Sequence, residues 1–229
     1  MLAVIGDIHG CYFTLKKLVE EIKHKYPAIP IYSVGDLIDR GNFSFEVFEF
    51  VLKEKIFFTP GNHEYMFYYF IRHPNSAMGD AWLYNGSDAT IRSYNGRMNK
   101  VSEHLDAVIK APLYFNLEDC FICHAGISSF YKSRLPNDVL SDLKLLNEVI
   151  SADLTNEHGI LWSRDILLDL GKLQVVGHTR QDEVTFIKEN NTVYIDTSAV
   201  GDNKLSAIIV EKNEIADVIS VPTFSDDIY

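Results

Sequence analysis

Five short polar segments each follow an apolar, strand-like run, and together they carry the residue types that bind metals and phosphate. They are Gly6-Asp-Ile-His-Gly10, Gly35-Asp-Leu-Ile-Asp-Arg-Gly41, Pro60-Gly-Asn-His-Glu64, His124-Ala-Gly126 and Gly177-His-Thr179. Because ligands of open α/β sheets bind at the carboxyl ends of strands, we expect these segments to meet at one rim. The flanking glycines permit positive φ and a close approach of the backbone.

Carboxylates, imidazoles and a carboxamide at one rim form the donor set of a metal site. An uncompensated buried carboxylate costs on the order of several kcal/mol, and a divalent cation is the usual compensation. The mixed oxygen and nitrogen donors disfavour Ca²⁺ and favour Mn²⁺, Fe or Zn²⁺ over Mg²⁺ alone. Six such donors exceed one tetrahedral site but suffice for two cations that share a carboxylate, an arrangement suited to phosphoryl displacement.

The five segments, in this order, resemble the signature of the phosphoprotein phosphatase family of calcineurin-like metallophosphoesterases, in particular its compact bacterial and phage members of the lambda-phosphatase type. Trp162-Ser-Arg164 and Tyr194-Ile-Asp-Thr-Ser-Ala-Val200 extend the resemblance from residue 6 to about residue 201. It implies an α/β fold in which two mixed β-sheets form a sandwich flanked by helices. Ser198 stands where the family pattern has glycine, which affects only the local turn.

The resemblance also implies a role for each polar residue. Asp7 and His9 are expected to bind a first metal, and Asn62, His124 and His178 a second, with Asp36 bridging the two. His63 falls on the general acid, Asp39 on the carboxylate that orients it, and Arg40 and Arg164 on phosphate-binding positions. The cofactor is expected to be two divalent ions, Mn²⁺ first, with Fe and Zn²⁺ as alternatives.

The residue types fit a direct hydrolysis. A water held by two cations is acidified toward hydroxide near neutral pH, so no serine or cysteine nucleophile is required. Arginine neutralises phosphate oxygens in a bidentate manner. His63 follows Asn62 directly and is placed to protonate the departing alkoxide, while Asp39 holds its imidazole charged and oriented.

The activity that the resemblance implies is that of a metal-dependent serine/threonine protein phosphatase, acting on phosphoproteins or phosphopeptides by attack of a hydroxide between the metals. A symmetrical bis(5'-nucleosyl)-tetraphosphatase shares the first three motifs and stays open as an alternative. Glu64, where aspartate would favour the dinucleotide, and the compact length favour the protein phosphatase. A non-catalytic metal-binding scaffold requires a missing ligand, and none is missing.

The elements that must position these residues are indicated by hydrophobic periodicity. Strand-like runs alternate with amphipathic helices in the first 65 residues and predict βαβ units, whereas the last 60 residues predict antiparallel β-structure. The segment 78–150 is mostly helical in pattern, with β-like pieces at 113–117 and 120–123. Without a linker or repeat, we expect one domain over residues 1–229; the role of residues 78–110 stays open.

Charge and cysteine usage limit the partners. The 229 residues carry a net charge of −11, which disfavours nucleic acid and anionic membranes as partners. No run approaches the roughly 18 apolar residues of a membrane span, and the N-terminus has no basic segment typical of a secretory signal. Three cysteines do not form a disulfide framework, so we expect a cytoplasmic protein. The oligomeric state stays open.

Cys120-Phe-Ile-Cys-His124 matches the C-x-x-C-H pattern of haem attachment. We expect no haem and two packed core thiols instead, because residues three apart in a strand point to opposite faces. His24, His73, His104 and His158 stand in polar contexts and are predicted to lie on the surface.

Overall fold

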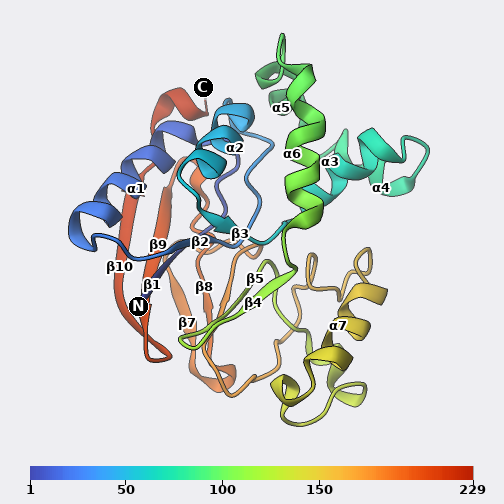
Figure 1. Ribbon diagram of the computed structural model, residues 1–229, viewed down its shortest axis with the longest axis vertical. Coiled ribbons are helices and arrows are strands. Elements are labelled where there is room, and N and C mark those ends of the chain that lie inside the picture. The colour runs from blue at the N-terminus through green and yellow to red at the C-terminus, as the bar shows by residue number, and fades with distance from the viewer. Residues whose placement is uncertain (229) are drawn as a thin grey trace.

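The computed structural model describes residues 1–228, which form two five-stranded sheets packed face to face (Figure 1). The first sheet has the order β10-β9-β1-β2-β3. Its strands are β1 (Leu2–Ile5), β2 (Ile31–Ser33), β3 (Phe57–Phe58), β9 (Lys204–Glu211) and β10 (Glu214–Pro222). Strands β1, β2 and β3 run parallel, while β9 and β10 pair antiparallel, so the sheet is mixed as predicted.

The second sheet has the order β4-β5-β6-β8-β7. Its strands are β4 (Tyr114–Asn116), β5 (Phe121–Cys123), β6 (Gln174–Val176), β7 (Thr185–Ile187) and β8 (Thr192–Tyr194). The prediction of antiparallel structure in the last 60 residues was wrong for β6 and β8, which pair parallel with Val175 opposite Val193. The chain first forms the edge strand β7 and then turns back into β8, so β8 takes the direction of β6.

The α-helices of residues 1–228 are 6 to 14 residues long. They are α1 (Tyr12–Lys25), α2 (Ser44–Lys53), α3 (Asn62–Arg72), α4 (Ala77–Trp82), α5 (Ser87–Ser93), α6 (Val101–Lys110) and α7 (Leu143–Ala152). Short 3₁₀ turns complete the elements: η1 (Met98–Lys100), η2 (Ser129–Ser133), η3 (Val139–Ser141), η4 (Lys188–Asn190), η5 (Ala199–Gly201) and η6 (Ser225–Asp227). Helices α1 and α2 pack on the first sheet and α7 on the second.

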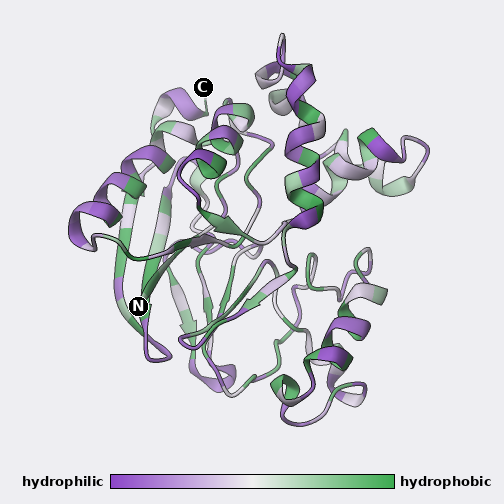
Figure 2. Cartoon of the chain, in the orientation of Figure 1, coloured by the Kyte–Doolittle hydropathy of each residue, from purple (hydrophilic) through white to green (hydrophobic). Residues whose placement is uncertain are grey.

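Strand alternation divides the core into layers. In β1, Leu2 and Val4 face the second sheet and pack with Ile122 and Val175, whereas Ala3 on the opposite face packs under the helices. Figure 2 shows the result, with largely hydrophobic strands and helices such as α1 that alternate hydrophobic and hydrophilic residues. The layer order is helix, sheet, sheet, helix, which confirms the predicted sandwich.

Cys120 and Cys123 are free, fully buried thiols on opposite faces of the second sheet. Cys120 belongs to the core between the sheets and Cys123 to the core under α7. Burial raises the pKa of each thiol to about 12. The prediction of two packed core thiols is therefore confirmed.

Two further features concern the surface. Within residues 1–228, no helix is long and apolar enough to cross a membrane.

His104 was predicted at the surface, but it is fully buried in α6, where it stacks on Phe48 and bonds to Tyr94 and Glu49. The prediction failed because a neutral histidine with two hydrogen-bond partners packs like an aromatic residue.

Candidate active site

A polar cavity of about 500 Å³ opens where the parallel strands of both sheets end. Eight of the ten residues singled out in the sequence line it: Asp7, His9, Asp36, Arg40, Asn62, His63, Arg164 and His178. The other two lie directly behind this lining, His124 in contact with Asn62 and Asp39 in contact with His63. The prediction that five strand ends converge on one rim is therefore confirmed.

Five of the candidate metal ligands reach the cavity from loops that follow a strand, whereas Asn62 is the first residue of α3. Asp7 and His9 follow β1, Asp36 follows β2, and His124 and His178 follow β5 and β6. Each of these four loops contains a residue in the left-handed backbone conformation. The φ angle is 45° at His9, 50° at Asp36, 62° at His178 and 95° at Gly126. For a non-glycine residue this conformation costs about 1–2 kcal/mol, which the surrounding structure must offset.

Gly61 and Gly177 each lie directly beneath the carboxylate of an aspartate, so neither position has room for a side chain. A Cβ atom at Gly61 would lie 2.0 Å from Oδ1 of Asp36, and one at Gly177 would lie 1.9 Å from Oδ1 of Asp7. Both distances are far below contact, so any larger residue would displace the carboxylate.

Backbone carbonyls fix the protonation of three imidazoles. Nδ1 of His9 donates to Ile38 O at 2.9 Å, and Nδ1 of His124 donates to Val34 O at 2.9 Å. Nε2 of His178 donates to Trp162 O at 3.1 Å. Since a carbonyl oxygen only accepts, the second nitrogen of each ring carries a lone pair, which is the form that binds metal.

These lone pairs converge. Nε2 of His124 lies 3.2 Å from Nδ1 of His178, and the two atoms lie 3.0 and 3.1 Å from Oδ1 of Asn62. Three acceptors this close repel one another unless a cation or a proton lies among them. The donor set therefore fits a divalent metal.

Asp36 belongs to two groups of donor atoms, each within 4.8 Å: one with His9 and His63, the other with His124 and His178. Its Oδ2 lies 3.4 Å from Nε2 of His9 and its Oδ1 lies 3.6 Å from Nε2 of His124. One carboxylate thus faces both halves of the site, as expected of a ligand shared by two metals.

Three imidazoles at the cavity carry no positive charge to balance the carboxylates beside them. Burial lowers the pKa of His178 to about 3 and also lowers the pKa values of His9 and His124, so the imidazoles are neutral. Burial raises the pKa of Asp7 well above its usual range, with the nearby carboxylates of Asp196 and Asp36 adding to the shift. Neutral imidazoles beside crowded carboxylates are the state that a divalent cation stabilises.

His63 differs from the other three imidazoles. Its Nδ1 lies 2.7 Å from Oδ2 of Asp39, and its Nε2 lies 4.0 Å from Oδ2 of Asp36. Burial alone lowers the pKa of His63, but the two carboxylates outweigh it and leave the pKa raised. A histidine that retains its proton is a poor ligand and a good acid.

Residues from the segment 78–110 hold Asp39 in place. The indole Nε1 of Trp82 donates to both Asp39 oxygens at 2.8 and 3.1 Å, and the hydroxyl of Thr90 donates to Oδ1 at 2.6 Å. The backbone N–H of Asp39 donates to Thr90 and Ser44. Neither Trp82 nor Thr90 was singled out in the sequence, because no local pattern links them to Asp39.

Three arginines line the cavity. Arg40 is half-buried, and its Nη1 donates to Nε2 of His9 at 2.7 Å, which agrees with a lone pair on this nitrogen. Arg164 and Arg180 are exposed at the rim. Arg180 was missed in the sequence although it stands two residues after His178.

Asp196 was also missed, although it lies in the quoted segment Tyr194–Val200 and lines the cavity. It follows β8 as Asp7 follows β1, so the signal that identified the other strand ends applies to it equally. Burial raises its pKa, and its Oδ1 accepts from the N–H of Ser198 at 3.0 Å. Ser198 has φ of 59°, so the expected glycine position is a left-handed turn.

Glu64 does not face the cavity. Its two oxygens accept from the backbone N–H groups of Gly61, Asp36 and Leu37 at 2.7 to 2.9 Å. This buried carboxylate positions the loop that carries Asp36. Its identity therefore says little about the substrate, although it had favoured a protein phosphatase in the sequence.

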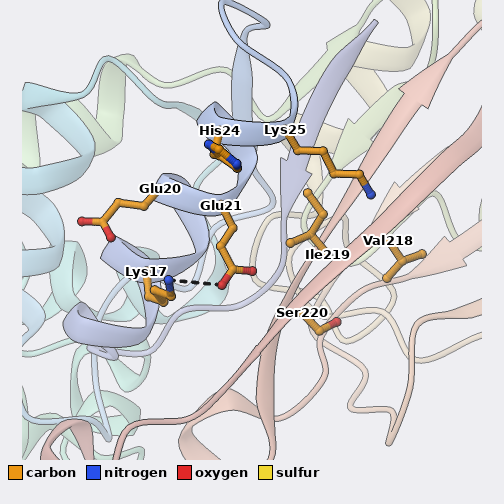
Figure 3. A pocket seen from close by; sticks show the side chains of 8 residues that line it. All are labelled: Lys17, Glu20, Glu21, His24, Lys25, Val218, Ile219 and Ser220. Carbon is orange, nitrogen blue, oxygen red and sulfur yellow. Dashed lines mark ion pairs between the residues drawn. The ribbon is translucent and has the colours of Figure 1, made fainter.

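A larger hollow of about 700 Å³ lies between α1 and β10 (Figure 3). Its charged side chains stand along the outer face of α1, where Lys17 and Glu21 form an ion pair at 3.4 Å. None of its lining residues belongs to the groups of donor atoms found in the described part of the chain. The smaller cavity, at which both groups of donor atoms lie, is therefore the candidate site.

A two-sheet sandwich with carboxylate, imidazole and carboxamide donors at its strand ends defines a metallophosphoesterase. The model of the calcineurin-like phosphoesterase family matches residues 1–201, and the chain belongs to that family. Members of this family use divalent metals. The predicted fold and family are thereby confirmed, while the identity of the metals stays a prediction.

The proteins to which this chain is similar carry names that state different substrates. The chain is 31% identical to the asymmetrical bis(5'-nucleosyl)-tetraphosphatase PrpE of Bacillus cereus (strain B4264), over 96% of this chain and 93% of the relative. A cold-active protein-tyrosine phosphatase of a psychrophilic Shewanella species has the same fold, with a TM-score of 0.64, 20% identity, and 96% and 79% of the two chains covered. A serine/threonine phosphatase of Saccharomyces cerevisiae also has this fold, with a TM-score of 0.61 and 17% identity. The match covers 98% of this chain and 80% of the phosphatase.

Proposed function

We propose that this chain hydrolyses dinucleoside tetraphosphates asymmetrically, releasing a nucleoside triphosphate and a nucleoside monophosphate, at a centre of two divalent cations. The observation that carries the proposal is that Arg40, Arg164 and Arg180 line one cavity with the metal-type donors. A bridged tetraphosphate carries about four negative charges, against about two on a phosphomonoester. Three guanidinium groups suit the longer anion. The name of the Bacillus cereus relative supports the same substrate.

The roles of the side chains follow from their contacts. Asp7 and His9 would hold one cation, and Asn62, His124 and His178 the other, with Asp36 shared between them. When bound, the two cations supply an acidified water and neutralise charge on the phosphate. We expect Mn²⁺ to support this chemistry, with Fe and Zn²⁺ as alternatives.

The chain's own groups orient and protonate the substrate. Arg40 is placed to donate to the phosphate oxygens, while Arg164 and Arg180 at the rim bind the phosphates further along. His63 holds its proton at Nε2, toward the cavity, because Asp39 accepts from Nδ1. That proton is available to the departing oxygen.

Phosphoserine and phosphothreonine, the substrates expected from the sequence, form a second candidate class. The pairing of His63 with Asp39 favours it, because an alkoxide leaving group needs a proton far more than a phosphate does. The three arginines of the cavity thus favour a dinucleoside tetraphosphate as substrate. His63, as the proposed acid, favours a phosphoserine or phosphothreonine ester. The name of the Bacillus cereus relative supports the same preference as the arginines.

The test is turnover of the Mn²⁺-loaded protein on diadenosine tetraphosphate beside a phosphothreonine peptide and p-nitrophenyl phosphate. We expect kcat/KM to be highest on the dinucleotide, with ATP and AMP as products. The matched variant Arg180→Gln should lower kcat/KM on the dinucleotide and leave p-nitrophenyl phosphate within about twofold, since one phosphate does not reach the rim. A hundredfold preference for the phosphopeptide would instead establish the second candidate, and two ADP molecules would indicate symmetrical cleavage.

A further inference from the structure

A second hollow adjoins the catalytic cavity and shares one wall with it. It measures about 680 Å³ and is lined by residues of α3, α4 and the segment that follows α7. Figure 1 shows α4 and α7 on the same side of the molecule, with the connecting segments between them. The residue that lines both hollows is Trp162. A ligand in the cavity therefore has this groove as its direct neighbour.

The two hollows differ in charge. Three arginines and three aspartates line the cavity, where a bound divalent metal would add positive charge, whereas Glu157 is the one charged residue among those that line the groove. The remaining groove surface includes Tyr69, Met78 and Ala81 beside Trp162. A substrate with an anionic part and a flat, uncharged part would place its phosphates in the cavity and the other part in the groove.

Trp162 is held in a fixed orientation. Its indole Nε1 donates to Leu154 O at 3.0 Å, and its ring packs against the cores of both halves of the molecule. Its backbone oxygen accepts from Nε2 of His178 at 3.1 Å. The residue that orients a candidate metal ligand thus also places an aromatic ring, held by packing and a hydrogen bond, beside the site, and a ring held in this way lowers the entropy cost of binding a base.

We infer that this groove binds one nucleoside of the dinucleoside tetraphosphate, with its base packed against Trp162. The inference rests on the proposed function. Stacking of a base on an aromatic side chain strengthens binding by about 5- to 150-fold. The carboxylate of Glu157, which is exposed at the groove, accepts hydrogen bonds from ribose hydroxyls or a base amino group but repels a further phosphate. Both features select a neutral nucleoside over an anion.

The test fills the groove without touching the cavity. Ala77 is exposed on α4 and lines the groove, so Ala77→Trp occupies the space of the base. We expect KM for diadenosine tetraphosphate to rise about tenfold. The values for p-nitrophenyl phosphate and inorganic tetraphosphate should stay within twofold, because neither carries a nucleoside. Leu83→Trp is the control, since Leu83 is exposed just after α4 but does not line the groove.

A binding measurement separates this inference from the proposed function. The chain has two tryptophans, and Trp82 is buried against Asp39, so quenching by adenosine reports on Trp162. Because the introduced tryptophan would itself fluoresce, adenosine binding to Ala77→Trp is measured by equilibrium dialysis. Saturable quenching in the wild type, together with loss of adenosine binding in Ala77→Trp, would support the groove even without turnover. Absence of quenching, or an unchanged KM in Ala77→Trp while the wild type cleaves the dinucleotide, would overturn the groove and leave the function standing. A rise in KM for the phosphopeptide alone would reassign the groove to peptide side chains.

Discussion

Nδ1 of His63 lies 2.7 Å from Oδ2 of Asp39, and both side chains are at most 1% exposed. The same ring directs Nε2 toward Asp36, which is 4.0 Å away. One imidazole thus connects a buried carboxylate with the reaction cavity. This contact with a carboxylate distinguishes His63 from the three imidazoles of His9, His124 and His178, whose rings donate to backbone carbonyls and keep a lone pair for a metal.

Replacing His63, the proposed general acid, should affect substrates according to their leaving groups. His63→Ala is expected to lower kcat on a phosphothreonine peptide by about 10² to 10⁴, because the alkoxide must be protonated as it departs. The loss should be much smaller on p-nitrophenyl phosphate, whose phenolate leaves without a proton. Steady-state kinetics on both substrates check this, and an equal loss would remove His63 from the acid role.

The support of Asp39 by Trp82 gives a second prediction. Trp82→Phe removes the Nε1 donor but keeps the stacking on Phe67, whose ring lies 4.8 Å away. We expect kcat on the phosphothreonine peptide to fall by about tenfold, since one hydrogen bond to a charged group is worth about 1.5–3 kcal/mol. The bound Mn²⁺, measured by elemental analysis, should be unchanged.

Tyr94→Phe is the matched control for this change. It removes a polar atom from the same aromatic cluster, but that hydroxyl bonds to His104 and not to Asp39. The control should keep wild-type kcat. If both variants lose the same activity, Trp82 acts through packing alone.

The sequence predicts those site residues that lie directly after a strand. Asp7, Asp36 and His178 are identified because strand and loop are neighbours in the chain, and topology brings the loop ends together. Trp82 lies 43 residues from Asp39, so their hydrogen bond depends on helix packing that no local pattern encodes. Arg180 and Asp196 were identifiable in principle, since both follow strands.

The fold was predictable to a similar degree. The apolar runs mark most strands, but β10 was not identified because exposed residues occupy every second position of this edge strand and interrupt its apolar run. The parallel direction of β8 also escaped prediction, because strand direction depends on where the chain crosses and not on strand composition.

His104 predicts a pH dependence of stability. Burial lowers its pKa below the ordinary value of 6.5, and the Glu49 carboxylate does not fully offset this. As pH falls through about 6.5, the unfolded chain takes up a proton that the folded chain does not, so the free energy of unfolding decreases. His104→Gln, which keeps a donor and an acceptor, should lose less stability than the wild type between pH 7.5 and 5 in urea titrations. Identical slopes would contradict the prediction.

Asp227 should stabilise the start of α1 from the far end of the chain. Its carboxylate accepts from the backbone N–H groups of Phe13 and Thr14 at 2.9 Å, and α1 has no cap from its own N-cap residue, Cys11. Asp227→Ala is expected to cost about 1–3 kcal/mol, because buried N–H groups lose their acceptor. Urea unfolding measures this, with the neighbouring exposed Asp226→Ala as the control.

The central claim, that two cations sharing Asp36 form the reaction centre, is tested by titrating metal-free protein with Mn²⁺ while following hydrolysis of p-nitrophenyl phosphate. We predict that the rate rises from near zero to a plateau at two equivalents, and that Asp36→Asn retains neither the metal nor the rate. Full activity without divalent metal, or a plateau at one equivalent that Asp36→Asn preserves, would contradict the account.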